Sequence, residues 1–356
     1  MQTHDRLRRV DGLRGVAIVL VLFGHEADFT LGYHVVGELG AVGVLMFFIL
    51  SGFLITGLLQ REIDDTGTVN HREFYLRRGL RILPAFWILV AVTVILKLAG
   101  LVTDVTWKAV AACIVFARNI RGRGQSLGHI WSLSLQEQFY LIWPQVMSRA
   151  GARHSLHAAI SLVVAGTLWR TWAIAVRLYP YESDVFYLRT DFRLDSILAG
   201  CVVALALSDA RISTAVRRGF QRVPIGMTTA ALIVWSLIAS QIDALRPVFL
   251  TVETALAVGA FGHFVIASGA SLVVRVCEHR ALVWLGMMSY SLYLWQQLFL
   301  VTREPSWGLL REFPMNLACV FAAALLSNRL IERPALRLRR RWSPAPTRAD
   351  PMAMGT

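Results

Sequence analysis

The stretch RLRRVDGLRGVAIVLVLFGHEADF, from Arg6 to Phe29, begins with a basic cluster, runs through apolar residues and ends in several polar ones. If it is one helix, Arg14 and His25 are about three turns or ~16 Å apart and lie on nearly one face. In a helix that spans a bilayer, Arg14 would sit near the headgroups and His25 deep in the membrane. A buried imidazole is costly there, so His25 is either hydrogen-bonded inside a helix bundle or part of a functional site.

The composition is that of a polytopic membrane protein. Of the 356 residues, 56% are hydrophobic and 17% are charged, whereas soluble domains are about 45–50% apolar and ~25% charged. The mean hydropathy is +0.54. The net charge of +13 fits arginine-rich cytoplasmic loops. No basic region outside the apolar runs is long enough to indicate a nucleic-acid-binding domain.

Eleven apolar segments predict the membrane-spanning helices. They are residues 13–31, 37–59, 80–101, 107–119, 130–148, 155–177, 187–208, 224–242, 247–269, 282–302 and 313–331. Segment 107–119 is short for a crossing, which needs about 17–25 residues. If it does not cross, most arginine-rich loops fall on one side, and the chain makes ten crossings with both termini in the cytoplasm. Arg118, Arg121 and Arg123 then lie outside.

We expect one membrane domain, residues 1–342, and a C-terminal tail, residues 343–356. The tail has three prolines and few apolar residues, so disorder is expected. No stretch is long enough for an appended soluble catalytic domain. The first apolar run contains His25 and lacks a small-residue cleavage site, which favours a retained span over a signal peptide. The four cysteines are scattered singly and predict neither a zinc site nor a disulfide framework.

The stretch HREFYLRRGLRILPAFW, residues 71–87, places Arg77, Arg78 and Arg81 at the entry to the third apolar segment. Arg78 and Arg81 are three residues apart and share a helical face. One interpretation is an anchor that keeps this loop in the cytoplasm. The other is a phosphate site, because the planar guanidinium fork matches phosphate oxygens.

The stretch HIWSLSLQEQFYLIWP, residues 129–144, puts many hydrogen-bonding side chains into an otherwise apolar span. Such groups are costly at membrane depth unless they pair with each other or line a wet cavity. Trp131, Ser134 and Tyr140 are therefore candidates for a cavity wall. Glu137 is a candidate catalytic carboxylate, and a structural ion pair with an arginine is the alternative.

Alternating charges mark YLRTDFRLDSILAGC, residues 187–201. They are carried by Arg189, Asp191, Arg193 and Asp195. Internal salt bridges explain this pattern more readily than direct catalysis does. Arg193 and Asp195 are also candidates to support an acceptor cavity, and Gly200 suits close helix packing.

Two further stretches near the C-terminus carry polar residues. In LGMMSYSLYLWQQ, residues 285–297, an aromatic belt explains part of the pattern, and the serines and glutamines suggest a polar cavity as well. In IERPALRLRRR, which begins at Ile331, we expect a helix that ends at Pro334. An amphipathic basic segment on the membrane surface would follow it.

Seven stretches of the sequence, six of them within or overlapping those described above, resemble motifs of the acyltransferase-3 family of integral membrane proteins, which includes bacterial O-antigen, nodulation-factor and macrolide O-acyltransferases. The resemblance runs from about Arg6 to Arg341, and the motifs occur in the order seen in the family. They are DGLRGVAIVLVLFGH, FFILSGFLIT, FYLRRGLRILPAFW, HIWSLSLQEQFYLIWP, DFRLDSILAG, SYSLYLW and IERP. The resemblance implies an all-α bundle of about ten transmembrane helices. It also implies transfer of an acyl group, acetyl or another short one, from acyl-coenzyme A to a hydroxyl of a sugar, glycolipid or polyketide.

The resemblance also implies roles for particular residues. His25 would be the catalytic base, with Arg14 supporting the site on the same helix. Arg78 and Arg81, with the adjacent Arg77, would hold the donor phosphates at the cytoplasmic face. The polar pattern of the sequence, apart from the resemblance, leads us to expect that the site or the acceptor cavity is supported by Asp28, Trp131, Ser134, Tyr140, Arg193 and Asp195. Acyl-coenzyme A is a co-substrate, and no bound cofactor or metal is expected because the histidines lack ligand spacing.

The chain departs from the family pattern at two places. Most relatives have two glutamates where this chain has Gln136 and Glu137, and relatives often have histidine in place of Gln296. Neighbouring residues on a helix cannot face the same point. Because a carboxylate can hold an imidazolium, we expect Glu137 to face the cavity with His25, and Glu137 or Asp28 to orient its ring.

A transporter or flippase for a lipid or glycan is the alternative function. It would also show intramembrane charges and many spans, although no inverted repeat is visible in the segment pattern. Thioester cleavage by the purified protein discriminates the two, because a carrier would show none. Either function places the protein in the bacterial cytoplasmic membrane, without a nucleic-acid partner. Some relatives carry an extra soluble hydrolase-like domain, and this chain ends too soon to include one.

Overall fold

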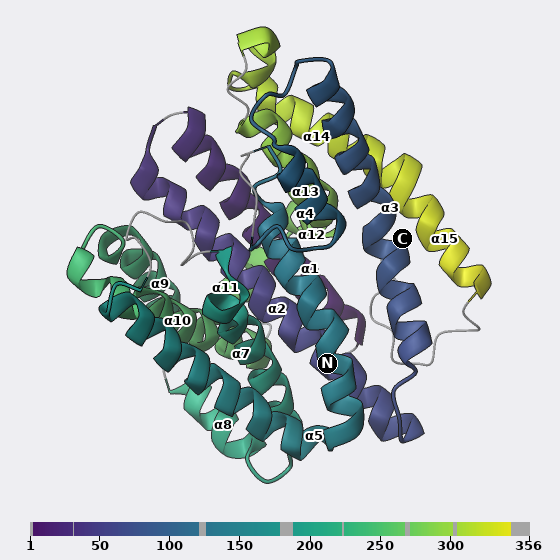
Figure 1. The fold of residues 1–356 in the computed structure, drawn as a ribbon. Coiled ribbons are helices and arrows are strands. Elements are labelled where there is room, and N and C mark those ends of the chain that lie inside the picture. Colours follow the sequence, from purple (N-terminus) through teal and green to yellow (C-terminus); the bar gives the residue numbers. More distant parts are fainter. Residues whose placement is uncertain are drawn as a thin grey trace.

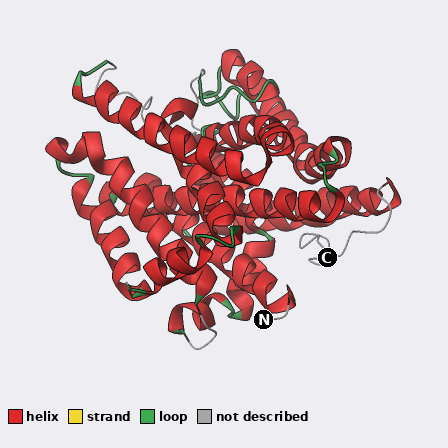
Figure 2. Ribbon diagram, turned by 90° about the horizontal axis from the view of Figure 1, so that it is seen from below, coloured by secondary structure: helices red, strands yellow, loops and turns green. Residues whose placement is uncertain are grey.

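A computed structural model describes residues 3–30, 32–120, 126–178, 188–222, 224–267, 271–301 and 305–342. Every regular element in these ranges is helical (Figures 1 and 2), which confirms the all-α prediction. The α-helices are α1 (Thr3–His25), α2 (His34–Thr66), α3 (His71–Leu98), α4 (Trp107–Ile114), α5 (Ile130–Ala175), α7 (Thr190–Ser208), α8 (Ser213–Gln221), α9 (Ile225–Ala239), α10 (Arg246–Ile266), α11 (Leu272–Cys277), α12 (Arg280–Met287), α13 (Ser289–Leu300), α14 (Met315–Ser327) and α15 (Arg333–Trp342). Shorter elements are the π-helices η1 (Glu26–Thr30) and η4 (Asn328–Glu332) and the 3₁₀-helices η2 (Asp243–Leu245) and η3 (Pro305–Arg311).

Several of these helices are long and apolar enough to cross a membrane. Five segments qualify within the described ranges, namely α2, α3, α5, Asp243–Ile266 and Met315–Leu338. The pair α7 and α8, bent by 117°, adds a sixth if it forms one span. The chain is therefore multi-pass in character, while the ten crossings and the cytoplasmic termini stay predictions.

The first and fourth predicted segments are not full spans by themselves. Only the second half of α1 is apolar, because its first half carries Arg8, Arg9, Asp11 and Arg14. Helix α4 has eight residues, about 12 Å, so it is too short to cross, as predicted. The tail 343–356 and Arg121 and Arg123 lie outside the described residues.

A backbone break inside α5 separates two segments that the sequence predicts as distinct spans. At Gly151 the dihedral angles are φ 67° and ψ 172°, and the helix on either side is regular. A positive φ is readily adopted only by glycine. The expected division between residues 148 and 155 is thus confirmed.

Helix α2 crosses the middle of the bundle, with α3 and α15 on one side and α8, α9 and α10 on the other (Figure 1). It meets α7 backbone to backbone through two glycines. A Cβ added to Gly52 would lie 1.9 Å from the carbonyl oxygen of Ile197, and one added to Gly200 would lie 2.1 Å from that of Ile49. The reciprocal contact confirms the packing role predicted for Gly200, since small residues allow helices in membranes to approach closely.

We expect Gly200→Ala to destabilise the protein, because the new methyl group collides with backbone rather than with a movable side chain. Overpacking of this kind costs about 1–3 kcal/mol. The matched control is Gly166→Ala in α5, where the nearest atom lies at 3.9 Å and alanine favours the helix by about 0.5–1 kcal/mol. Thermal unfolding in detergent should therefore show a lower Tm for Gly200→Ala only. Equal Tm values for the two variants would contradict the close contact between Gly200 on α7 and the backbone of α2.

Glycines also fix α1 against α12, and this contact positions the site. A Cβ on Gly15 would lie 1.9 Å from the carbonyl oxygen of Leu282, and one on Gly286 would lie 1.7 Å from that of Asp11. The close approach brings Arg14 on α1 beside the start of α13, which follows α12 directly.

The C-terminal helix does not end at Pro334, and that prediction was wrong. Helix α14 continues through the π-helical turn η4 into α15, in which Pro334 is the second residue. A proline is tolerated near the start of a helix, because the first N–H groups have no partner inside the helix. The π turn immediately before it provides such a start.

Candidate active site

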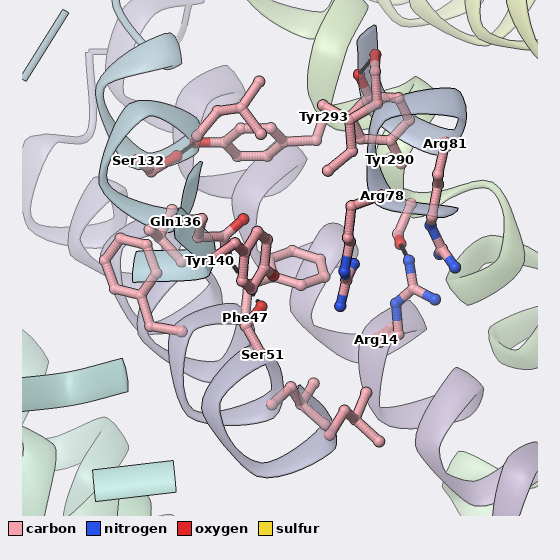
Figure 3. Close-up of a pocket in the computed structure, with 17 residues that line it drawn as sticks. Arg14, Phe47, Ser51, Arg78, Arg81, Ser132, Gln136, Tyr140, Tyr290 and Tyr293 are labelled. Atoms are coloured by element: carbon pink, nitrogen blue, oxygen red, sulfur yellow. Dashed lines mark hydrogen bonds between the residues drawn. The ribbon is translucent and has the colours of Figure 1, made fainter. Parts of the chain in front are cut away.

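Three arginines surround a cavity of about 110 Å³ between α1, α2, α3, α5 and α13. Arg14 comes from α1, and Arg78 and Arg81 come from α3. Figure 3 shows their guanidinium groups pointing toward one another at one end of this space, with Tyr140 and Gln136 across from them. We call it the arginine cavity.

Neighbouring side chains hold two of the guanidinium groups in place. Arg14 Nη2 donates a hydrogen bond of 2.8 Å to Ser289 Oγ, and Arg14 Nη1 lies 3.5 Å from a carboxylate oxygen of Asp11. The guanidinium carbon of Arg78 lies 4.4 Å from the centre of the Tyr140 ring. Three guanidinium groups around one small cavity form a site for a polyanion, because their forks suit phosphate or carboxylate oxygens.

Arg77 is directed elsewhere. Its Nη1 lies 2.5 Å from Glu73 Oε1, and its Nη2 lies 3.9 Å from Glu62 Oε2. It does not line the arginine cavity. Arg77 lies one turn before Arg81, and its carboxylate partners on α2 and α3 hold its side chain outside the cavity.

The motifs SYSLYLW and IERP support the wall that α13 contributes. Tyr290 donates a hydrogen bond of 2.7 Å to the carbonyl oxygen of Ile82 on α3. Ser291 donates a hydrogen bond of 2.6 Å to Glu332, which also accepts one from Ser327 at 3.1 Å. These bonds tie α13 to α3 and to the helix that follows α14.

A second cavity, of about 340 Å³, lies at the C-terminal end of α1. Its polar and aromatic lining comes from His25, Asp28, His129, Trp131, Arg193, Tyr293 and Gln297. We call it the histidine cavity. It brings together four of the predicted residues, His25, Asp28, Trp131 and Arg193.

His25 is held through both nitrogens of its ring. Nδ1 lies 2.8 Å from the carbonyl oxygen of Val21, one turn earlier on α1, and Nε2 lies 3.2 Å from the amide nitrogen of Gln297. The partner at Nδ1 is therefore a backbone carbonyl, not the carboxylate that we expected from Asp28 or Glu137. Asp28 lies on the π turn that follows His25, lines the same cavity and pairs with His34. Single π turns inside helices are frequent at functional sites.

The two cavities share a wall. Val44 and Tyr293 line both of them. The Tyr293 hydroxyl lies 2.5 Å from Ser132 Oγ and donates a hydrogen bond of 3.1 Å to the carbonyl oxygen of His129. Arg14, near the middle of α1, and His25, at its C-terminal end, thus lie on one helix as predicted, each in its own cavity. Tyr293 lies between the two cavities.

The expected orientation of Gln136 and Glu137 is reversed in the structure. Gln136 lines the arginine cavity and donates a hydrogen bond of 3.2 Å to Ser51 Oγ. Glu137 lines neither cavity, and its Oε1 is buried without a hydrogen-bond partner among the described residues. The contact of Gln136 with α2 sets the rotation of α5, which points the next residue elsewhere.

The remaining predicted residues divide between the cavities and the surrounding structure. Tyr140 lines the arginine cavity, whereas Ser134 and Asp195 line neither cavity. Ser134 Oγ accepts a hydrogen bond of 3.3 Å from the backbone N–H of Arg118. Asp195 forms a buried salt bridge of 2.8 Å with Arg170. The pair Arg189 and Asp191, also at 2.8 Å, agrees with the prediction of internal salt bridges in this stretch.

Three polar residues of the histidine cavity, His129, Tyr293 and Gln297, were not predicted as site residues. His129 and Gln297 are buried, and the backbone N–H of His129 donates a hydrogen bond of 2.7 Å to Gln297 Oε1. His129 and Gln297 belong to the polar stretches 129–144 and 285–297. Their partnership across 168 residues has no signal in a single sequence.

The chain is similar in sequence to known acyltransferases. A sequence profile of an acyltransferase domain, acyltransferase 3, matches residues 7–331. The chain is 27% identical over 352 residues to the peptidoglycan O-acetyltransferase OatA of Listeria monocytogenes, covering 91% of this chain and 55% of the relative. It is 28% identical over 338 residues to the putative peptidoglycan O-acetyltransferase YrhL of Bacillus subtilis, covering 85% and 50%. It is 26% identical over 307 residues to a putative O-acetyltransferase of Staphylococcus aureus, covering 80% and 49%. The chain thus spans about half the length of these curated relatives, and no solved structure gives a significant match.

Proposed function

The chain belongs to the acyltransferase-3 family, and from this premise we propose that it is a membrane O-acyltransferase that uses acyl-coenzyme A. The family match agrees with the seven motifs that suggested it. The mechanism is supported most directly by the position of His25, which lines a cavity that shares a wall with the cavity of the three arginines.

In this proposal the arginine cavity binds part of the donor. Coenzyme A carries several phosphates, and Arg14, Arg78 and Arg81 offer planar donor forks for such oxygens. The positive-inside rule places these arginines on the cytoplasmic side, where acyl-coenzyme A is made. Glu137 lies within electrostatic range of Arg78, and we assign it the role of restraining that side chain. Arg77 contributes to the positive field from outside the cavity.

The histidine cavity would take the acceptor. Its lining combines an indole from Trp131 with charged and amide groups, a combination suited to a sugar with its apolar faces and hydroxyl edges. The relatives in Listeria and Bacillus bear the names of peptidoglycan O-acetyltransferases. We therefore propose a glycan hydroxyl as the acceptor and acetyl as the group that is transferred, with a glycolipid or polyketide hydroxyl as the alternative.

The proposed reaction uses His25 as general base. Nε2 takes the proton of the acceptor hydroxyl while its oxygen attacks the thioester carbonyl. The tetrahedral intermediate then breaks its carbon–sulfur bond, and the imidazolium returns the proton to the leaving thiolate. The products are the ester and free coenzyme A, so no other reactant is needed. General-base catalysis of this kind typically contributes 10²–10⁴-fold to the rate.

Incubation of the purified protein in nanodiscs with radiolabelled acetyl-coenzyme A and soluble glycan fragments tests the proposal. We expect labelled glycan and free coenzyme A to form in equal amounts. The alternative function, a transporter or flippase, predicts no thioester cleavage above that of empty nanodiscs, and this result would refute the acyltransferase.

A further inference from the structure

We propose that Gln297 is a positioning residue that keeps His25 in the tautomer needed for a base, and that His129 in turn fixes Gln297. The inference rests on the proposed role of His25 as base. It is carried by a chain of hydrogen bonds in the histidine cavity. The backbone N–H of His129 fixes the orientation of the Gln297 amide, and that amide and the carbonyl oxygen of Val21 fix the proton position on the His25 ring.

The orientation of the Gln297 amide follows from the backbone of His129. The N–H of His129 can only donate, and it points at the Oε1 atom of Gln297 over 2.7 Å. That atom must therefore be the carbonyl oxygen. A flipped amide would set its NH₂ group against the backbone N–H, two donors face to face. The Nδ1 atom of His129 approaches the same oxygen at 3.1 Å, and its Nε2 lies 2.9 Å from the carbonyl oxygen of Leu294.

The amide orientation then determines the tautomer of His25. The NH₂ group of Gln297 can only donate, and it lies 3.2 Å from His25 Nε2. Nε2 must accept, so it carries a lone pair and no proton. At the other side of the ring, the carbonyl oxygen of Val21 can only accept, so Nδ1 carries the hydrogen over 2.8 Å. The ring is neutral, with Nε2 available as the base.

The surroundings make this arrangement rigid. His129 is 2% exposed and Gln297 is 7% exposed, so water has little access to replace the hydrogen bonds between them. Polar networks that are buried and fully paired hold their members in one geometry. An acceptor hydroxyl that enters the cavity would take the place of the amide N–H at Nε2 and find the lone pair already directed at it.

The test uses two variants of similar volume. In Gln297→Glu, one carboxylate oxygen keeps the bond from the His129 N–H, and the other faces His25 Nε2 as an acceptor. Nε2 should then hold a proton, so His25 becomes doubly protonated and ceases to be a base near neutral pH. In Gln297→Leu, the contact with Nε2 disappears, and only the carbonyl oxygen of Val21 still favours a proton on Nδ1.

Solid-state NMR of protein labelled with ¹⁵N-histidine reports the tautomer directly, and His25→Asn identifies the His25 signals. In the wild type we expect Nδ1 protonated and Nε2 unprotonated, and in Gln297→Glu both nitrogens protonated. The control is Gln138→Glu, which alters a hydrogen-bonded glutamine in the network with Asn119 and Thr190, away from both cavities. It should leave the His25 signals unchanged.

The pH dependence of acyl transfer gives a second measurement. The acid limb of the rate profile of Gln297→Glu should lie at least about one pH unit higher than in the wild type, a tenfold loss of rate at a fixed lower pH. Gln297→Leu should lose rate without that displacement. Among the described residues that line this cavity, the other titratable groups are Asp28, His129, Arg193 and Tyr293, and α2 contributes glycine, alanine and valine. Glu38 on α2 lies within electrostatic range of Asp28 and Arg193. These groups are the same in both variants, so the difference between the variants reports the carboxylate.

Two results would overturn the inference. One is a wild-type His25 that carries its proton on Nε2. The other is a folded Gln297→Glu variant with an unchanged tautomer and pH profile, which would mean that Gln297 only packs α13 against α5. If the wild type shows the expected tautomer but cleaves no thioester, the proposed function fails and the hydrogen-bond assignment stands.

Discussion

His25→Ala is expected to lower the rate of acyl transfer by about 10²–10⁴-fold, the size of a general-base contribution. The imidazole is the only group in the proposed mechanism that takes the proton of the acceptor, and His25 lines the cavity assigned to that acceptor. Folding should be spared, because the cavity of about 340 Å³ has room for water to bond with the Gln297 amide that the substitution exposes.

The measurement is transfer of radiolabel from acyl-coenzyme A in membranes with equal amounts of folded protein. His157→Ala is the matched control, since His157 is exposed on α5 and far along the chain from either cavity, and it should keep wild-type activity. If His25→Ala retains more than about a tenth of the activity, His25 is not the base.

Arg78→Ala and Arg81→Ala should each raise the Michaelis constant for acyl-coenzyme A about 10-fold or more, with a smaller effect on kcat. Each substitution removes charge-assisted hydrogen bonds worth about 1.5–3 kcal/mol to the donor phosphates. The two side chains approach the same cavity from one face of α3. Their loss should therefore weaken donor binding more than it slows the chemical step. That step takes place at His25, in the cavity on the other side of Tyr293.

Three comparisons sharpen this experiment. Arg78→Lys and Arg81→Lys should restore binding only in part, because lysine keeps the charge and loses the planar fork. Arg72→Ala removes an exposed arginine from the same helix and should leave the donor constant unchanged. If both cavity variants have a normal donor constant, the arginines serve only to orient the chain in the membrane.

The sequence alone determined those features that depend on local chemistry and spacing. The apolar runs specified a helical membrane protein, because only a helix or a closed barrel satisfies the backbone in lipid. The spacing of Arg14 and His25 placed a cation and an imidazole on one helix about three turns apart. The break near residue 150 and the close packing at Gly200 were also predictable, since both depend on the absence of a side chain in glycine.

Only the tertiary structure decided which side chains meet. Gln136 and Glu137 are neighbours, and the packing of α5 on α2 determines which of them reaches the arginine cavity, here through the bond from Gln136 to Ser51. Arg14 is hydrogen-bonded to Ser289, which lies 275 residues away in the sequence, and His129 is hydrogen-bonded to Gln297, 168 residues away. The direction of a side chain on a helix is set by the neighbours that bury that helix. No spacing within one segment contains this information, so the histidine cavity and its glutamine emerge only when α1, α5 and α13 are packed together.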